Sequence, residues 1–215
     1  METIIPLNQD SLNSIFRTSI KYPETIAIRE SSRIEFKESF NWGSREAYAR
    51  TLAAFANTKG GYIIYGIVNT TLQLIGLKND NFEKIDPGII SGYLNDAFSP
   101  EIKWHMLRYE FQDKYFGLLY VEESFDKPLI ARKNIGNEIK EGEIYYRYRG
   151  RTEKIKYPEL RKIIDNQQLK EREYWIKTFR KIAKVGVKNI GLFDFKNGKV
   201  TGSGGSFIID KSLFG

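Results

Sequence analysis

The stretch AFANTKGGYIIYGI, residues 54–67, decides the fold because it joins the end of a helix to the start of a buried strand. A helix is predicted over 45–58, since Gly60-Gly61 is a pattern that ends helices. The following run YIIYGIV, residues 62–68, is apolar on both faces. Two apolar faces are typical of a strand in the middle of a sheet. We therefore expect a central strand directly after this helix.

Strand and helix patterns are mixed in the rest of the chain, without a strict βαβα rhythm. The order predicts an α+β (mixed α/β) fold, with a mixed sheet flanked by helices and a long helix near the C-terminus. Further strands are predicted at 34–37, 72–77, 102–111, 115–121, 129–132, 144–150 and 207–210, and further helices at 8–20, 84–97 and 157–184, the last interrupted near 166–168.

The composition limits the possible chemistry. The 215 residues include no cysteine and a single histidine, His105, which excludes disulfides, thiolate sites and zinc sites built from imidazoles. Any metal would be a hard cation held by oxygen ligands. The sequence contains no apolar run of membrane-spanning length and no secretory signal pattern, so we expect no membrane contact and a cytoplasmic location.

The basic residues favour an acidic partner, of which nucleic acid is the commonest. The formal net charge is +7, and residues 145–162 hold seven Lys or Arg against two Glu. Within this segment Arg147, Arg149 and Arg151 stand at alternate positions, so on one strand they would project from one face. Such a row suits a phosphate backbone. The alternative is an exposed strand face that charge keeps soluble.

Two acidic residues, Glu30 and Glu35, lie close together in RESSRIEFKE, residues 29–38. On a strand over 34–37, Glu35 and Lys37 share the face opposite the apolar residues. Glu30 reaches that face only if the chain bends just after it. The two carboxylates are either solvated charges paired with nearby Arg or Lys, or they are held together to bind a cation.

Three motifs, ESxxIEFK (30–37), AFANTKGGY (54–62) and IYYRYRGRT (144–152), occur in this order. Together they resemble the Schlafen AlbA_2 family over about residues 24–156. Family members are often named DNA-binding or ATP-binding, and eukaryotic members include ribonucleases that cut tRNA with three carboxylates and a divalent cation. The resemblance implies a Schlafen AlbA_2-like domain over 1–156. We expect 157–215 to be a basic helical extension and tail, followed by a further domain.

The resemblance also implies roles for individual residues. Glu30 and Glu35 match the first two carboxylates of the nucleases, and would be catalytic residues and ligands of Mg²⁺ or Mn²⁺. Asn69 stands where the third carboxylate is expected; its amide oxygen could complete the metal site, but without a charge, so metal affinity should be low. Lys37, with the three arginines, would bind the phosphates.

Two functions follow from the resemblance. The first is a nucleic-acid-binding domain that acts as a metal-dependent ribonuclease on tRNA or other structured RNA. The alternative is a non-catalytic nucleic-acid-binding or assembly module, because Asn69 replaces the third carboxylate. The sequence does not separate RNA from DNA, although the resemblance favours RNA. No phosphate-loop motif GxxxxGK[ST] supports ATP binding. The nucleases close a groove with two related lobes, so a single motif set predicts a homodimer, with a contribution from 157–184.

Overall fold

The computed structural model describes residues 7–186, 191–194, 199–202 and 205–208, and the chain divides into two compact units, Met1–Leu160 and Arg161–Gly215. The first unit has the predicted mixed α/β fold. Its elements are α1 (Gln9–Ile15), β1 (Ile34–Lys37), a 3-10 helix (Trp42–Ser44), α2 (Arg45–Asn57), β2 (Gly61–Tyr65), α3 (Asn81–Lys84), α4 (Pro87–Ala97), β3 (Phe98–Ser99), β4 (Trp104–Phe111), β5 (Lys114–Val121), β6 (Ile130–Ala131), β7 (Tyr145–Tyr148), β8 (Arg151–Lys154) and the start of α5 (Tyr157–Val185).

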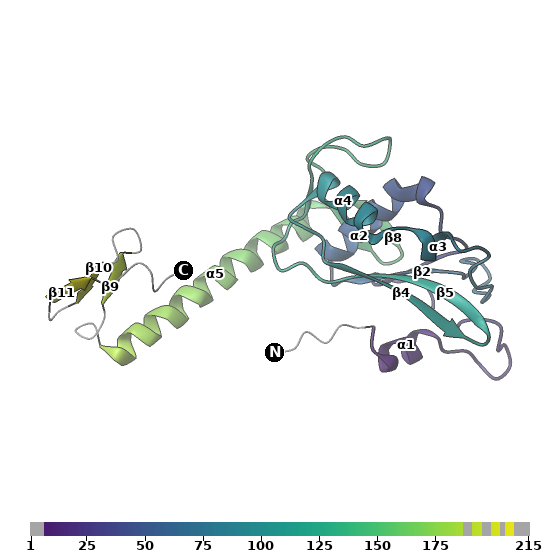
Figure 1. Ribbon diagram of the computed structural model, residues 1–215, viewed down its shortest axis with the longest axis horizontal. Helices are drawn as coiled ribbons and strands as arrows, with labels where there is room; N and C mark the ends of the chain where they lie inside the picture. The colour runs from purple at the N-terminus through teal and green to yellow at the C-terminus, as the bar shows by residue number, and fades with distance from the viewer. Residues whose placement is uncertain (1–6, 187–190, 195–198, 203–204, 209–215) are drawn as a thin grey trace. The chain divides into compact units, whose positions relative to one another are not determined.

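The main sheet has the strand order β1-β2-β5-β4, so the predicted central strand β2 is indeed an inner strand. It pairs with β1 in parallel and with β5 antiparallel. Its side chains alternate between two cores: Ile63 and Tyr65 pack in the core formed with α2 and α4, while Tyr62 and Ile64 pack in the core formed with α1. Helices therefore cover both faces of the sheet (Figure 1), which explains why β2 is apolar on both sides.

The elements predicted at 72–77 and 84–97 are wrong, each for a local backbone reason. The segment 72–77 makes only isolated bridges, because Leu72 and Gly76 adopt positive φ angles of 62° and 73° that interrupt an extended chain. The helix predicted over 84–97 is split into α3 and α4. Pro87 begins α4 and holds the preceding residue Asp86 in an extended conformation, as prolines do.

The junction between α2 and β2 shows why the AFANTKGG segment has this sequence. Gly60 has a φ of 68°, the predicted left-handed helix stop. A Cβ at Gly61 would lie 2.6 Å from the carbonyl oxygen of Arg33 and from the Phe55 ring, so only glycine lets β2 begin there. The segment is thus shaped by close packing against the chain around it.

Asn57, the last residue of α2, is a buried connector between distant segments. Its amide donates to the carbonyl oxygens of Leu129, at 3.1 Å, and Tyr145, at 3.0 Å, and its oxygen accepts from the Leu129 amide at 2.7 Å. These bonds attach the strand β7 and the segment before β6 to the end of α2. Because both segments lie far away in sequence, Asn57 fixes tertiary structure as well as ending a helix.

Replacing Asn57 with Ala should lower the free energy of unfolding by about 2–3 kcal/mol, because three buried backbone groups lose their partner. Asn95→Ala, at an exposed position of α4, should change it by less than about 0.5 kcal/mol. Urea denaturation of the two variants measures the difference. Equal stabilities would show that Asn57 is not a tertiary connector.

The second unit consists of the remainder of α5 and a three-stranded antiparallel sheet. The sheet has the order β11-β10-β9, with β9 at Leu192–Asp194, β10 at Lys199–Gly202 and β11 at Gly205–Ile208. The predicted interruption of the long helix is wrong, since α5 is continuous. Of the strand predicted at 207–210, residues 209 and 210 lie outside the described residues.

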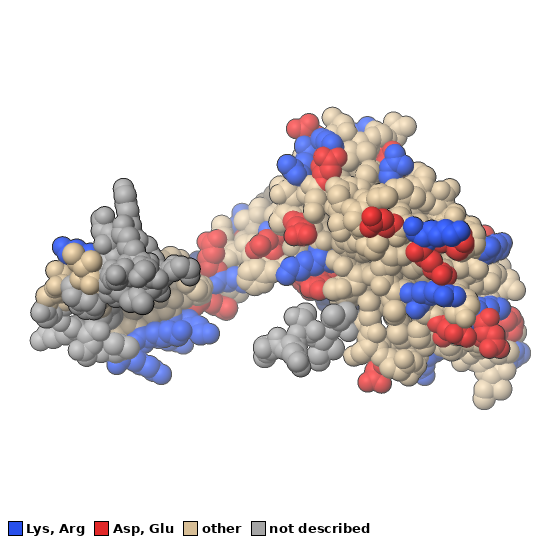
Figure 2. All heavy atoms as spheres, in the orientation of Figure 1, with Lys and Arg blue, Asp and Glu red and all other residues tan. Residues whose placement is uncertain are grey.

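The second half of α5 presents basic and aromatic side chains to solvent. Tyr174, Trp175 and Phe179 are exposed, and Figure 2 shows basic side chains gathered toward this part of the helix. Homodimerisation through this helix remains a prediction. Among the helices of the described residues, none combines the length and apolar character needed to cross a membrane.

Candidate functional site

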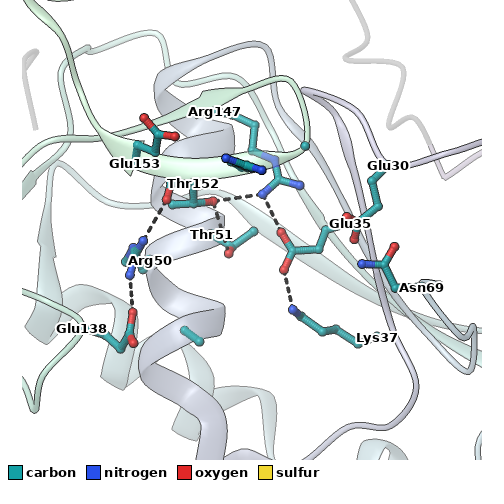
Figure 3. A pocket seen from close by; sticks show the side chains of 13 residues that line it. Glu30, Glu35, Lys37, Arg50, Thr51, Asn69, Glu138, Arg147, Thr152 and Glu153 are labelled. Atoms are coloured by element: carbon teal, nitrogen blue, oxygen red, sulfur yellow. Dashed lines mark hydrogen bonds and ion pairs between the residues drawn. The ribbon is translucent and has the colours of Figure 1, made fainter.

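Six of the seven predicted site residues, all except Arg149, line one solvent-open hollow of about 390 Å³ in the first unit. It lies between β1, the side of α2 and the β7–β8 hairpin (Figure 3). Its charged lining consists of four carboxylates and four cations: Glu30, Glu35, Glu138 and Glu153, with Lys37, Arg50, Arg147 and Arg151. The hollow is therefore close to neutral, although the whole chain is basic.

Glu35 lies on the side of β1 that faces α2, because the neighbouring Phe36 fills the opposite core. The predicted alternation along β1 is confirmed: Glu35 and Lys37 share a face, and their Oε1 and Nζ atoms lie 2.7 Å apart. Oε2 of Glu35 lies 2.6 Å from Nη1 of Arg147. Both oxygens of this buried carboxylate, in a residue only 8% exposed, are thus paired with cations.

Arg147 points inward from the middle of β7, and its side chain is only 1% exposed. Besides Glu35, the guanidinium donates to the Thr152 hydroxyl at 3.0 Å and to the carbonyl oxygen of Ser31 at 3.3 Å. It also lies over the Phe55 ring, 5.0 Å from its centroid. Buried and bonded in this way, Arg147 does not offer its charge to an external phosphate in this conformation.

The prediction that Arg147, Arg149 and Arg151 form a row on one strand face is wrong. β7 ends at Tyr148, and Arg149, with a φ of 53°, and Gly150 form the two-residue turn into β8. Arg149 and Arg151 are exposed, whereas Arg147 is buried. Among the described residues, neither exposed arginine has an ion-pair partner.

Glu30 is brought to the same hollow by a bend, as its predicted convergence with Glu35 required. The Ser31 amide bonds to the carbonyl oxygen of Ile34 at 3.0 Å. Oε1 of Glu30 accepts from the Phe36 amide at 2.9 Å, which covers the open edge of β1. Figure 3 shows Glu30 and the exposed Asn69 on the side of Glu35 away from α2.

These residues do not fit a Mg²⁺ or Mn²⁺ site as they stand. Such a cation needs several anionic oxygens, but both oxygens of Glu35 are paired and one oxygen of Glu30 is bonded to the backbone. Asn69 carries no charge. In the part of the chain that the structure describes, no three Asp, Glu or His side chains are grouped to hold a metal. Lys37 and Arg147 already supply positive charge here.

The sequence did not indicate that Arg50 and Thr152 would join this site. Arg50, on α2, pairs with Glu138 and donates to the Thr152 carbonyl oxygen at 2.8 Å. Thr152 thus joins two arginines, accepting from Arg50 through its backbone and from Arg147 through its hydroxyl. The available signal for Arg50 was a basic residue two positions before the apolar run Leu52–Ala56 of α2.

Tyr148 ties the hairpin to the start of α5. Its hydroxyl donates to Oε2 of Glu159 at 2.9 Å and accepts from the Lys156 amide at 2.8 Å. Burial, with Glu159 nearby, raises the pKa of Tyr148 to about 12. The hydroxyl therefore keeps its proton and remains a donor at physiological pH.

Replacing Arg147 with Met should lower the free energy of unfolding by about 3 kcal/mol, because Glu35 would remain buried without its main partner. Arg151→Met removes the same charge four positions away on an exposed side chain and should cost less than about 0.5 kcal/mol. Urea denaturation at neutral pH measures both. A loss below 1 kcal/mol for Arg147→Met would contradict a buried ion pair.

Comparison with known proteins places the first unit in a family. The family model "Schlafen, AlbA_2" matches residues 30–156. The chain is 42% identical over 200 residues to the uncharacterized ATP-binding protein UU034 of Ureaplasma parvum serovar 3; the match covers 86% of this chain but only 56% of that relative. The chain thus spans little more than half of that protein's length.

Two solved structures are similar at low sequence identity. The DIP2311 protein of Corynebacterium diphtheriae is 15% identical, with a TM-score of 0.47 over 67% of this chain and 25% of that one. The N-terminal domain of a RecG-related protein of Nitrosomonas europaea is 23% identical, with a TM-score of 0.36 over 54% and 82% of the two chains. Because the family model covers more than half of the sequence and contains all three motifs, the chain belongs to the Schlafen AlbA_2 family.

Proposed function

We propose that this chain binds nucleic acid through the turn of the β7–β8 hairpin and does not cut it by metal-dependent chemistry. One observation carries the proposal. Arg149 and Arg151 are both exposed, Arg151 lines the hollow, and no carboxylate among the described residues pairs with either of them. Two free guanidinium groups on a tight turn can each bind a phosphate through two hydrogen bonds.

The charge distribution supports a local contact at this turn. Figure 2 shows acidic and basic side chains interspersed over the visible face of the first unit. The charges that line the hollow also balance. Among the cations around the hollow, those that are exposed are therefore the groups best placed to contact a polyanion. Lys37, whose side chain is 39% exposed, can add a phosphate contact while it remains paired with Glu35.

The absence of metal-dependent cleavage is supported by the ligand groups themselves. Cleavage of this kind needs a cation that lowers the pKa of an attacking water and neutralises the phosphate. Glu35 is already bound to two cationic side chains, and Asn69 contributes no charge. The proposal is thus the alternative that the sequence left open, a non-catalytic nucleic-acid-binding module. The metal-dependent nuclease is the competing function.

The curated relative is named as an ATP-binding protein, and the phosphates of ATP could bind the same two arginines. The chain has no phosphate-loop motif to enclose them. ATP should therefore act only as a weak competitor of nucleic acid at this turn.

Replacing both Arg149 and Arg151 with Ala should weaken binding to single-stranded RNA, tRNA and duplex DNA alike, by roughly tenfold or more. The dependence of log affinity on log salt should become shallower by about 2, because two phosphate contacts are lost. Fluorescence anisotropy at three salt concentrations measures both quantities, with ATP added in a parallel series.

The matched control is Lys78→Ala with Lys103→Ala, two exposed lysines in the same unit. It removes the same charge and should change affinity less than twofold. An equal loss in both variants would mean that net charge, and not the turn, binds nucleic acid. RNA cut by the wild type in MnCl₂, spared in EDTA and spared with Glu30→Gln/Glu35→Gln, would establish the nuclease instead.

A further inference from the structure

We propose that Glu35 is a positioning residue for nucleic-acid binding: through Arg147, it holds the β7–β8 turn at the rim of the hollow. This inference rests on the proposed function and adds a role for a residue that the family resemblance assigns to a metal. Two observations support this role: the residues of the site fit a metal ion poorly, and the β7–β8 hairpin is held in place by contacts of its side chains.

The β7–β8 hairpin depends on side chains for its position. It forms a separate two-stranded sheet, and its strands do not pair with the four-stranded sheet. Asn57 anchors its first residue, Tyr145, and Arg50 anchors Thr152 in β8. The ion pair between Arg147 and Glu35 is the charged anchor on the strand that leads into the turn, two residues before Arg149.

The segment around Glu35 supplies the hydrogen-bond acceptors for the Arg147 guanidinium. Three groups from this short segment accept its hydrogen bonds: the Glu35 carboxylate at 2.6 Å, the Ser31 carbonyl oxygen at 3.3 Å and the Ile34 carbonyl oxygen at 3.5 Å. The bend that brings these acceptors together also places Glu30 against the turn. A Cβ added at Gly150 would lie 3.6 Å from that of Glu30.

Loss of the Glu35 charge should therefore displace the turn. A guanidinium with a buried side chain and no counter-ion is strongly unfavourable, so Arg147 would move toward water. Residues 148–151 follow it directly in the chain and would lose their fixed place. A divalent metal ion would not bind well beside the intact ion pair, because the positive charges of Lys37 and Arg147 would repel it. A positioning role and a metal-ligand role therefore predict different behaviour.

The first test measures nucleic-acid affinity in a mutant cycle. Glu35→Gln in the wild-type background should weaken binding to a labelled RNA by roughly tenfold, about as much as Arg149→Ala/Arg151→Ala. In the Arg149→Ala/Arg151→Ala background it should have almost no further effect, because Glu35 acts through that turn. The result should be the same in EDTA and in MnCl₂. Additive losses, or an effect seen only with MnCl₂, would overturn the proposal.

The second test follows the hairpin directly and needs no ligand. Hydrogen exchange of residues 145–154 should accelerate at least tenfold in Glu35→Gln, while exchange of β5 stays unchanged. Glu38→Gln is the matched control, since it removes the same charge from an exposed neighbour and should alter neither region. Unchanged exchange at 145–154 would refute the positioning role. If the wild type binds no nucleic acid, the proposed function fails, but this measurement still decides the role of Glu35.

A third variant covers the case in which Glu35→Gln unfolds. Replacing Glu35 with Gln and Arg147 with Met together removes the unmatched buried charge, and Met can pack on the Phe55 ring. This double variant should be more stable to urea than either single variant. If the two losses of stability simply add, Glu35 and Arg147 act independently and the proposal is wrong.

Discussion

The buried ion pair between Glu35 and Arg147 holds together the part of the fold that forms the site. It joins the first of the three sequence motifs to the last, and Arg147 also lies over the Phe55 ring of the second. Asn57 and Thr58, from that second motif, bond to Tyr145 and Arg147 of the third. The three motifs thus form one structural unit, because buried polar groups of the third motif make their hydrogen bonds and ion pair with residues of the first and second.

The part of the fold that local patterns determine could be predicted from the sequence. The apolar run of β2, the helix stop at Gly60 and the two faces of β1 depend on residues only a few positions apart. Parity also showed that Glu30 reaches the face of Glu35 only through a bend, and the structure has a bend there. These predictions succeeded because strand alternation and glycine geometry require no knowledge of distant residues.

The hairpin could not be predicted in this way. Alternating tyrosines and arginines fit one continuous strand as well as two strands joined at Arg149 and Gly150. Nothing beside Arg147 in the sequence indicates burial, because its counter-ion lies 112 positions earlier. Glu35 was expected to bind a metal and Arg147 a phosphate, and the two bind each other. A family motif can thus specify the architecture, while the role of each of its residues has to be argued from the side chains around it.

The separation between Glu35 and Arg147 also has a consequence for synthesis on the ribosome. At about 5–20 residues per second, Glu35 waits on the order of ten seconds before Arg147 is made. In that interval β1, α2 and β2 can already assemble, but the carboxylate and the Asn57 amide must remain hydrated. The nascent domain therefore keeps one side open until its last hairpin arrives. A chain truncated before residue 145 should therefore lack the partners that cover the Glu35 carboxylate and one Asn57 hydrogen bond, and should be more easily digested by proteases than the full chain.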